Sequence, residues 1–306
     1  MPRNSFAYFY HLLTTKVYIT NNGVPSYIPF RKSQIIINTW HGGGAYKKVG
    51  ISITNDSNWY EKKIQQSFYR TIPYYISSSK VFTEISSFSF NTSKEKFLPF
   101  GMPRNDSFFS NQIKEKYNRK VRTYFKLDDD IFIVLYAPTY RNNPQKSEFE
   151  MTLDLPSLIS SIQEHFNVTK VCIMFRTHHT INDKYQLNNC LNVSDYEYMQ
   201  ELLCTADMLI SDYSSCIWDY SFTYRPCILF TPDLQEYKSN RNFYFPIESW
   251  GFPIAQTNQE LQKVILNFNI TQFVEAMKRH HEALGSYEVG KGAKLTSDFI
   301  LSKIKL

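Results

Sequence analysis

Short, continuous apolar runs separated by helical stretches constrain the fold of this chain more than any other feature. Runs of this length and character are typical of strands buried on both faces of a parallel sheet. Helical patterns such as Leu155–Phe166 and Asp195–Cys204 lie between them. The alternation predicts an α/β, doubly wound fold. The expected strands are Lys16–Thr20, Gln34–Asn38, Tyr74–Ile76, Ile131–Tyr136, Val171–Phe175, Met208–Ile210 and Cys227–Phe230.

The length of 306 residues is about that of two domains. The segment Asn111–Asp130 is rich in charge and precedes the strongest expected strand, which indicates a domain boundary near residue 120. We therefore expect two Rossmann-like domains, 1–120 and 121–306, with ligand loops at the carboxyl ends of the strands. Lys291–Leu306 is predicted to be a packing helix that ends the second domain. Because the first expected strand starts only near Val17, the N-terminal half is expected to be shortened.

Charge and composition exclude several classes of protein. Lys and Arg total 34 against 28 Asp and Glu, a mild positive excess that favours anionic partners, but no basic-aromatic module predicts nucleic-acid binding. No apolar run reaches the roughly 18 residues that a membrane-spanning helix needs. Five cysteines without a CxxC pair indicate reduced thiols, neither disulfides nor a zinc site. The apolar start, Ser5–Tyr10, has no cleavage signal after it and is interpreted as mature sequence.

A histidine beside three glycines is the first candidate reactive group. His41 follows the expected strand Gln34–Asn38, at the end where α/β proteins place their reactive side chains. Gly42 and Gly43 would let a ligand approach the backbone closely, and Lys47 would add positive charge. The alternative is a glycine-rich turn beside a solvated lysine pair.

Two further clusters follow expected strands and carry groups that can bind phosphate. Thr139 and Arg141 can donate hydrogen bonds to phosphate oxygens, although an ordinary strand-end turn is the alternative. Arg176 and His178 share one face of an extended segment, whereas His179 points to the other face and is expected to be structural or exposed. Adjacent histidines rarely bind one metal ion together, so no metal site is predicted.

The segment around residue 212 gives the fourth cluster. A strand runs into Asp212, and Ser214 and Ser215 then open a helix whose N-terminus can hold an anion. Simple helix capping is the alternative role for these serines. Asp233, after the following strand, is assigned to the same phosphate site. Other polar runs are expected to be solvated: Asp128–Asp130 as a turn and His280–His281 as a surface face.

Taken in order, these motifs resemble the CDP-glycerol glycerophosphotransferases, which build teichoic acids and related surface polymers. The resemblance extends over about residues 8 to 265. One departure concerns the loop after His41, where Gly43–Tyr46 makes the stretch before Lys47 one residue longer than in the usual motif. Because the longer loop lies beside His41, the acceptor specificity of the family does not carry over to this chain directly. The matching motifs are Trp40–Gly42, Gly101–Asp106, Ala137–Arg141, Arg176–His178 and Asp212–Ser215.

The resemblance implies a fold of the glycosyltransferase-B type, with two Rossmann-like domains facing across a cleft. It also implies that an acceptor hydroxyl attacks the glycerol-bearing phosphorus of CDP-glycerol and releases CMP. His41 would be the general base, and His178, Arg176 and Arg141 would stabilise the pyrophosphate, with phosphate held at Ser214–Ser215. No metal or other cofactor is implied. Support of the His41 loop is assigned to Gly42, Gly43, Lys47, Arg104 and Asp106.

The same resemblance sets the expected partners and location. We expect CDP-glycerol, a lipid-linked or polysaccharide acceptor, and the inner membrane surface as partners of a cytoplasmic, peripherally bound enzyme. Two alternatives remain. One is a transferase of the same fold that uses a nucleotide sugar or CDP-ribitol, and the other is a truncated, non-catalytic binding paralogue.

Overall fold

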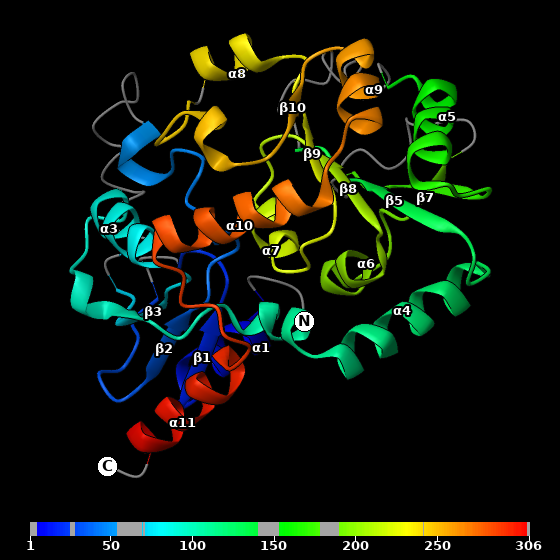
Figure 1. Cartoon of the computed structure of the whole chain (residues 1–306). Coiled ribbons are helices and arrows are strands. Elements are labelled where there is room, and N and C mark those ends of the chain that lie inside the picture. The colour runs from blue at the N-terminus through cyan, green and yellow to red at the C-terminus, as the bar shows by residue number, and fades with distance from the viewer. Residues whose placement is uncertain are drawn as a thin grey trace. The chain divides into compact units, whose positions relative to one another are not determined.

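Two compact units make up the chain in the computed structural model, which describes residues 5–24, 28–53, 69, 71–139, 153–177, 190–240 and 242–304. The first unit comprises Met1–Asp106 and Glu282–Leu306, and the second comprises Ser107–His281. Each unit has a parallel β-sheet with helices packed around it (Figure 1). The α/β class with parallel sheets predicted from the sequence is therefore confirmed.

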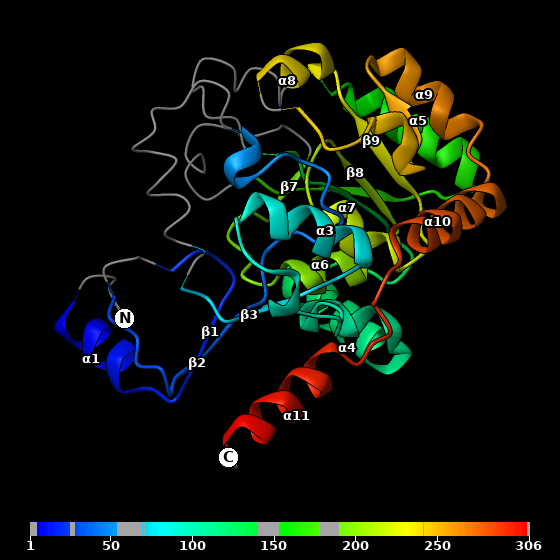
Figure 2. The same cartoon turned by 90° about the vertical axis from the view of Figure 1, so that its left-hand side faces the viewer.

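The first unit has a four-stranded parallel sheet in the order β1-β2-β3-β4. Strand β2 is buried along its whole length, which explains its continuous run of isoleucines. Figure 2 shows α1 to the left of β1 and β2, and α11 below β3. The strands are β1 (Val17–Thr20), β2 (Ile35–Asn38), β3 (Tyr74–Ile76) and β4 (Phe97–Leu98), and the helices are α1 (Phe6–Thr14), α3 (Lys80–Ser89) and α11 (Gly292–Ile304), with 3-10 turns η1 (Gly50–Ile53), η2 (Lys94–Lys96) and η3 (Pro103–Phe109).

The final helix belongs to the first unit, which corrects its expected place in the second domain. Phe299 packs edge-on against Tyr74 at 4.8 Å between ring centroids and lies 6.0 Å from the ring of Phe100. Ile300 and Ile304 add to the same core. The chain thus leaves the first unit after Asp106 and returns to it at Glu282, so the division does not fall near residue 120. The final helix joins the first unit because its side chains pack against core residues that are far away in the sequence.

The second unit has a six-stranded parallel sheet in the order β10-β9-β8-β5-β6-β7. Numbered from β5, this is the 3-2-1-4-5-6 order of the Rossmann fold. The order reverses between β5 and β8, where such folds bind their ligands. The strands are β5 (Phe132–Tyr136), β6 (Val171–Phe175), β7 (Leu191–Asn192), β8 (Met208–Ser211), β9 (Cys227–Phe230) and β10 (Ile254–Ala255).

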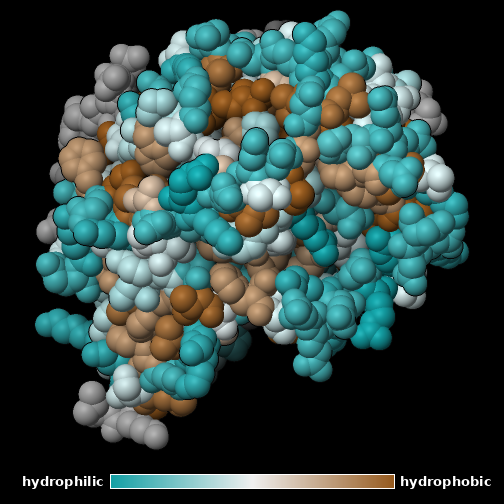
Figure 3. All heavy atoms as spheres, in the orientation of Figure 1, coloured by the Kyte–Doolittle hydropathy of each residue, from teal (hydrophilic) through white to brown (hydrophobic). Residues whose placement is uncertain are grey.

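Helices of the second unit follow the strands in the expected α/β alternation. The segment that was expected to mark a domain boundary forms a 15-residue helix, α4, capped by the Ser110 hydroxyl, which accepts from Ile113 N. Its outward surface is hydrophilic in Figure 3, whereas hydrophobic residues gather over α11. The helices are α4 (Asn111–Phe125), α5 (Leu155–Phe166), α6 (Met199–Thr205), α7 (Cys216–Ser221), α8 (Leu234–Asn240), α9 (Asn258–Leu266) and α10 (Ile270–Leu284), with the 3-10 turn η5 (Ile247–Trp250).

The histidine pair of α10 is buried, so its expected surface position is wrong. The ring of His281 stacks on Phe222 at 4.3 Å, and its Nε2 lies 2.7 Å from the hydroxyl of Ser221. That hydroxyl donates its one proton to the carbonyl of Trp218, so it accepts from His281 Nε2–H. Burial lowers the pKa of His280 to about 4 and that of His281 to about 3. Both rings are therefore neutral near pH 7.

Candidate functional site

The loop that carries His41 begins with a left-handed residue at the carboxyl end of β2. Trp40 has φ of 52°, a conformation that costs a residue with a side chain about 1–2 kcal/mol. Its N–H donates to the side chain of Asn38 at 2.7 Å, and the Asn38 amide donates to the carbonyl of Asn22 at 2.8 Å. The Trp40 ring packs 4.7 Å from the ring of Phe90 in the core. These contacts offset the strain and fix the direction in which the chain leaves the strand.

His41 itself is exposed, and its ring lies 4.2 Å from that of Trp40. Its Nδ1 is 3.1 Å from the carbonyl oxygen of Asn21. A carbonyl can only accept, so Nδ1 carries the proton and the neutral ring has its lone pair on Nε2. Nε2 is therefore the atom that can take a proton from a bound hydroxyl.

Two contacts from other elements hold the His41 loop. Arg104 donates from Nη1 to the carbonyl of Trp40 at 3.2 Å, and the Ser78 hydroxyl donates to the carbonyl of Gly43 at 2.5 Å. Gly43 is buried, whereas Gly42 and Lys47 are half-buried. The loop is thus held by its backbone, which leaves the His41 ring at the surface.

The carboxylate of Asp106 lies at the start of α11. Its two carboxylate oxygens accept from the backbone N–H groups of Gly292 and Ala293, both at 2.8 Å. These are the first two residues of α11, so Asp106 caps that helix. These contacts direct the carboxylate to a helix far along the chain, and its support of the His41 loop stays a prediction.

In the second unit, Thr139 and Asp212 meet where the strand order reverses. Both the N–H and the hydroxyl of Thr139 donate to Asp212 Oδ1, at 2.9 and 2.6 Å. One residue earlier, the Ser211 hydroxyl donates to the carbonyl of Ala137 at 2.7 Å. Asp212 is almost completely buried. The Thr139 hydroxyl thus gives its proton to Asp212, which differs from the phosphate-donor role expected for it.

Ser214 and Ser215 lie at the start of α7, as expected, and both are half-buried. The Ser214 hydroxyl accepts from Cys216 N at 3.4 Å, whereas the side chain of Ser215, the residue before the helix, makes no capping hydrogen bond. The helix has only six residues, so its dipole is small. Any phosphate here would depend on the local N–H groups and hydroxyls.

Arg176 and Asp233 each contact a neighbouring part of the protein. Arg176 Nη1 donates to the carbonyls of Tyr196 and Val193, at 2.5 and 3.3 Å, and burial lowers the pKa of its guanidinium. Asp233 accepts from the hydroxyl of Tyr213 at 2.9 Å. Both side chains therefore join strand ends to the loops beside them, in addition to any contact with a ligand.

Three candidates, Arg141, His178 and His179, lie outside the described residues. Other residues were not predicted as part of the site. Asn38 and Trp40 orient the His41 loop, and the signal that could have found Asn38 is an amide directly at the end of an all-isoleucine strand. Nothing in the sequence marks the left-handed turn at Trp40, because that conformation usually calls for glycine or asparagine.

Two features are absent from the part of the chain that the structure describes. Among the described residues, no three His, Cys, Asp or Glu side chains come close enough together to hold a metal ion. No helix within the same part of the chain has the length and apolar character needed to cross a bilayer.

Comparison with known sequences points to one family. The family model described as CDP-glycerol:poly(glycerophosphate) glycerophosphotransferase matches residues 1–294. A teichoic acid poly(glycerol phosphate) polymerase of Staphylococcus epidermidis is 28% identical over 100% of this chain and 44% of its own length. A teichoic acid ribitol-phosphate primase of Bacillus spizizenii is 30% identical over 97% of this chain and 77% of its own. The chain thus spans less than half of the first of these relatives.

The fold agrees with that comparison. A variant of the wall teichoic acid polymerase TagF superposes with a TM-score of 0.86 and 27% identity, covering 100% of this chain and 77% of that one. A TagF variant soaked with CDPG superposes with a TM-score of 0.85, at 27% identity over 100% of this chain and 76% of that one.

Proposed function

Since the chain belongs to the CDP-glycerol:poly(glycerophosphate) glycerophosphotransferase family, we propose that it transfers glycerol phosphate from CDP-glycerol to a hydroxyl of a cell-surface polymer or lipid-linked acceptor. The acceptor oxygen forms a bond to the glycerol-bearing phosphorus as the bond from that phosphorus to the CMP oxygen breaks. CMP leaves, and the acceptor proton passes to the protein. The family match over residues 1–294 is the observation that carries this proposal.

His41 is the proposed general base. Its Nδ1–H is directed to the Asn21 carbonyl, so the proton of the acceptor hydroxyl would be received at Nε2. Proton transfer of this kind needs a group whose ordinary pKa lies near neutrality, as that of an imidazole does. Arg104, through the Trp40 carbonyl, is a positioning residue for this loop.

The donor would be held by the second unit, near the point where its strand order reverses. Asp212 and Thr139 keep the two loops together there, so their role is to position the loops that flank the phosphates. Ser214–Ser215 would bind a phosphate at the start of α7, and Arg141 and His178 would stabilise its charge. Arg176 would hold the end of β6 through the Tyr196 carbonyl.

The arrangement of the two units and the cellular location of the enzyme belong to the same proposal. The two units would contribute acceptor-side and donor-side groups to one cleft, as in a glycosyltransferase-B fold, and a shortened N-terminal half stays a prediction. The enzyme would work in the cytoplasm at the inner face of the membrane, where a lipid-linked acceptor is accessible. Salt should then release it from membranes, because the attraction to anionic lipid is screened.

A second donor is favoured by one observation, the 30% identity to a ribitol-phosphate primase. CDP-ribitol has the same activated phosphorus, so the chemistry would be unchanged. The polyol would be distinguished by contacts beyond the phosphate. CDP-glycerol and CDP-ribitol must therefore be compared directly.

The decisive experiment measures CMP release by the purified chain with CDP-glycerol and lipid-linked or saccharide acceptors. Acceptor-dependent release from CDP-glycerol is expected, together with a larger thermal stabilisation by CDP-glycerol or CMP than by UDP or GDP sugars. Preferred release from CDP-ribitol would reassign the donor. Stabilisation by CDP-glycerol without release from any CDP-polyol would favour the non-catalytic binding alternative.

A further inference from the structure

An open cavity of about 770 Å³ lies in the first unit, at the end of the sheet opposite to His41. Lys16 precedes β1, Gln34 precedes β2 and Pro73 precedes β3, so the cavity is built on the amino ends of three parallel strands. His41 follows the carboxyl end of β2. The cavity is therefore separate from the proposed catalytic group.

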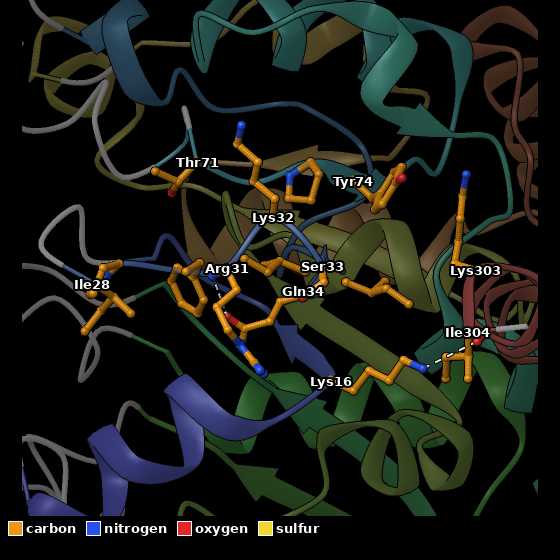
Figure 4. A pocket seen from close by; sticks show the side chains of 15 residues that line it. Lys16, Ile28, Arg31, Lys32, Ser33, Gln34, Thr71, Tyr74, Lys303 and Ile304 are labelled. Carbon is orange, nitrogen blue, oxygen red and sulfur yellow. Dashed lines mark hydrogen bonds between the residues drawn. The ribbon is translucent and has the colours of Figure 1, made fainter. Parts of the chain in front are cut away.

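The rim of this cavity is cationic. Lys16, Arg31, Lys32 and Lys303 all line it, and none of its lining residues is acidic. Figure 4 shows these four side chains reaching the cavity from different sides. All four are exposed, so each can keep its charge. Four positive charges around one opening attract an anion.

Hydrogen bonds to the protein hold two of the four cations, and Lys303 lies over the rings of Tyr74 and Phe299. Arg31 Nη2 donates to the carbonyls of Thr14 and Thr15 at the end of α1, at 3.0 and 3.3 Å. Lys16 donates from Nζ to the carbonyl of Ile304 on α11 at 3.4 Å (Figure 4). The rim is thus preformed, because α1 and α11 are tied to it at opposite edges.

The interior of the cavity is apolar, which makes the whole site amphipathic. Ile28, Phe30 and Ile304 contribute apolar surface, and the ring of Phe30 stacks on Tyr18 at 5.9 Å. A phosphate alone, or a polyol phosphate, would use the rim but leave this apolar surface in water. A molecule with a phosphate attached to hydrocarbon would use both.

Exposed apolar side chains lie on α1 and α11, the two helices whose ends accept hydrogen bonds from the rim residues Arg31 and Lys16. Phe6 is 88% exposed and Tyr10 is 57% exposed, one helical turn apart on α1. Leu301, two residues before Lys303 on α11, is 52% exposed. Aromatic and aliphatic groups beside basic ones are typical of a surface that lies at a lipid–water interface.

From this combination, we propose that the cavity binds the phosphate headgroup of an anionic phospholipid in a membrane surface. The lysines and Arg31 contact the phosphate, and Phe6, Tyr10 and Leu301 contact the interfacial hydrocarbon. The inference rests on the membrane location within the proposed function and on no step of the transfer reaction.

The test uses the full chain and vesicles of phosphatidylglycerol mixed with phosphatidylcholine, in flotation assays without CDP-glycerol. The variant Lys32→Gln/Lys303→Gln should bind these vesicles more weakly, by about fivefold for each lysine removed. The matched control, Lys80→Gln/Lys291→Gln, loses the same charge from exposed residues of the first unit at the other ends of β3 and α11, and should bind like the parent.

A second measurement separates a built site from diffuse attraction. Calorimetry with a monomeric, short-chain phosphatidylglycerol should show saturable binding that the Lys32→Gln/Lys303→Gln variant loses. Equal loss of vesicle binding in both double variants, or no binding of the monomeric lipid, would overturn the proposal. Saturable binding of poly(glycerol phosphate) or inorganic phosphate without vesicle binding would also overturn it. CMP release is measured separately, so failure here is distinct from failure of the proposed transfer reaction.

Discussion

The carboxylate of Asp212 accepts both the backbone N–H and the hydroxyl of Thr139, which joins the loops after β5 and β8 where the second sheet changes strand order. Because this carboxylate is nearly buried, losing either Thr139 donor would leave it less well satisfied. The geometry of the proposed phosphate site thus depends on a pair that need not touch phosphate.

Thr139→Val, which keeps the shape of the side chain but removes its hydroxyl, should lower the free energy of unfolding by about 1.5–3 kcal/mol, since the lost bond is to a buried carboxylate. CDP-glycerol binding should weaken as well. Thr139→Ser retains the hydroxyl and is the control. Urea denaturation and calorimetry measure the two effects, and a Val variant as stable and as tight-binding as the parent would contradict this role.

His41→Ala should lower the rate of CMP release about 10²–10⁴-fold, the usual contribution of a general base. Binding of CDP-glycerol should change little, because the donor is assigned to the second unit. His11→Ala, which removes an exposed histidine from α1 of the same unit, is the control and should keep full activity. A fully active His41→Ala enzyme would end the proposed mechanism while leaving the fold unaffected.

His178→Ala should reduce both the rate of CMP release and the affinity for CDP-glycerol, since its proposed partner is the pyrophosphate. His179→Ala, on the next residue, should be tolerated, because successive side chains of the extended segment that the sequence predicts would point to opposite sides. Kinetics and calorimetry on the two variants provide the comparison. If His179→Ala has the larger effect, the assignment of the two histidines must be reversed.

Asp106→Ala should destabilise the protein by about 1 kcal/mol, the typical cost of removing a helix cap. Its carboxylate satisfies the first two N–H groups of α11, Gly292 and Ala293, which would otherwise depend on water. Asp106→Asn should restore part of the loss, because asparagine also caps helices well. Equal stability of the Ala variant and the parent in urea would show that the cap contributes nothing.

Acid should destabilise the fold through the buried histidines of α10. The pKa of His281 is lowered to about 3 and that of His280 to about 4, whereas both titrate near 6.5 in the unfolded chain. As the pH falls from about 6.5 to about 4, only the unfolded chain gains these protons, so stability decreases. Each histidine contributes at most about 1.4 kcal/mol per pH unit.

The variant His281→Phe tests this pH dependence. It removes one titrating group while keeping a ring that can stack on Phe222, so stability should fall less steeply between about pH 6.5 and 4. Ser221→Ala is the control, because it removes the hydrogen-bond partner but leaves the imidazole to titrate. Urea denaturation across this range measures both slopes. Parallel slopes for His281→Phe and the parent would contradict the assignment.

The sequence predicted the seven strands of three or more residues in the part of the chain that the structure describes, because most of them are largely buried and form continuous apolar runs, as Ile35–Asn38 does. Strand β1 is the exception in burial, since Ile19 is 52% exposed. The short strands Phe97–Leu98, Leu191–Asn192 and Ile254–Ala255 were missed, since two residues carry no detectable pattern. The end of a helix that packs on the core is equally hard to predict. His280–His281 reads as polar, yet aromatic neighbours such as Phe222 enclose it.

The candidate site was predictable in position more than in detail. Residues at strand ends, such as His41 and Asp212, could be located because parallel strands bring their carboxyl ends to one edge. Their partners could not, since each contact depends on folding in three dimensions. Asp106 illustrates the difference, because its partners, Gly292 and Ala293, come almost two hundred residues later in the chain.

The return of α11 to the first unit has a consequence for the order of events during synthesis. A ribosome completes Ser107–His281 before it reaches Gly292, so the second unit can fold from one uninterrupted stretch. The first stretch of the first unit is made earlier, but Phe299 and Ile300 reach it only after the whole of Ser107–His281 has been translated. Until then its core is open on one side, and a chaperone that shields apolar surface would have to protect that side while the second unit is being made.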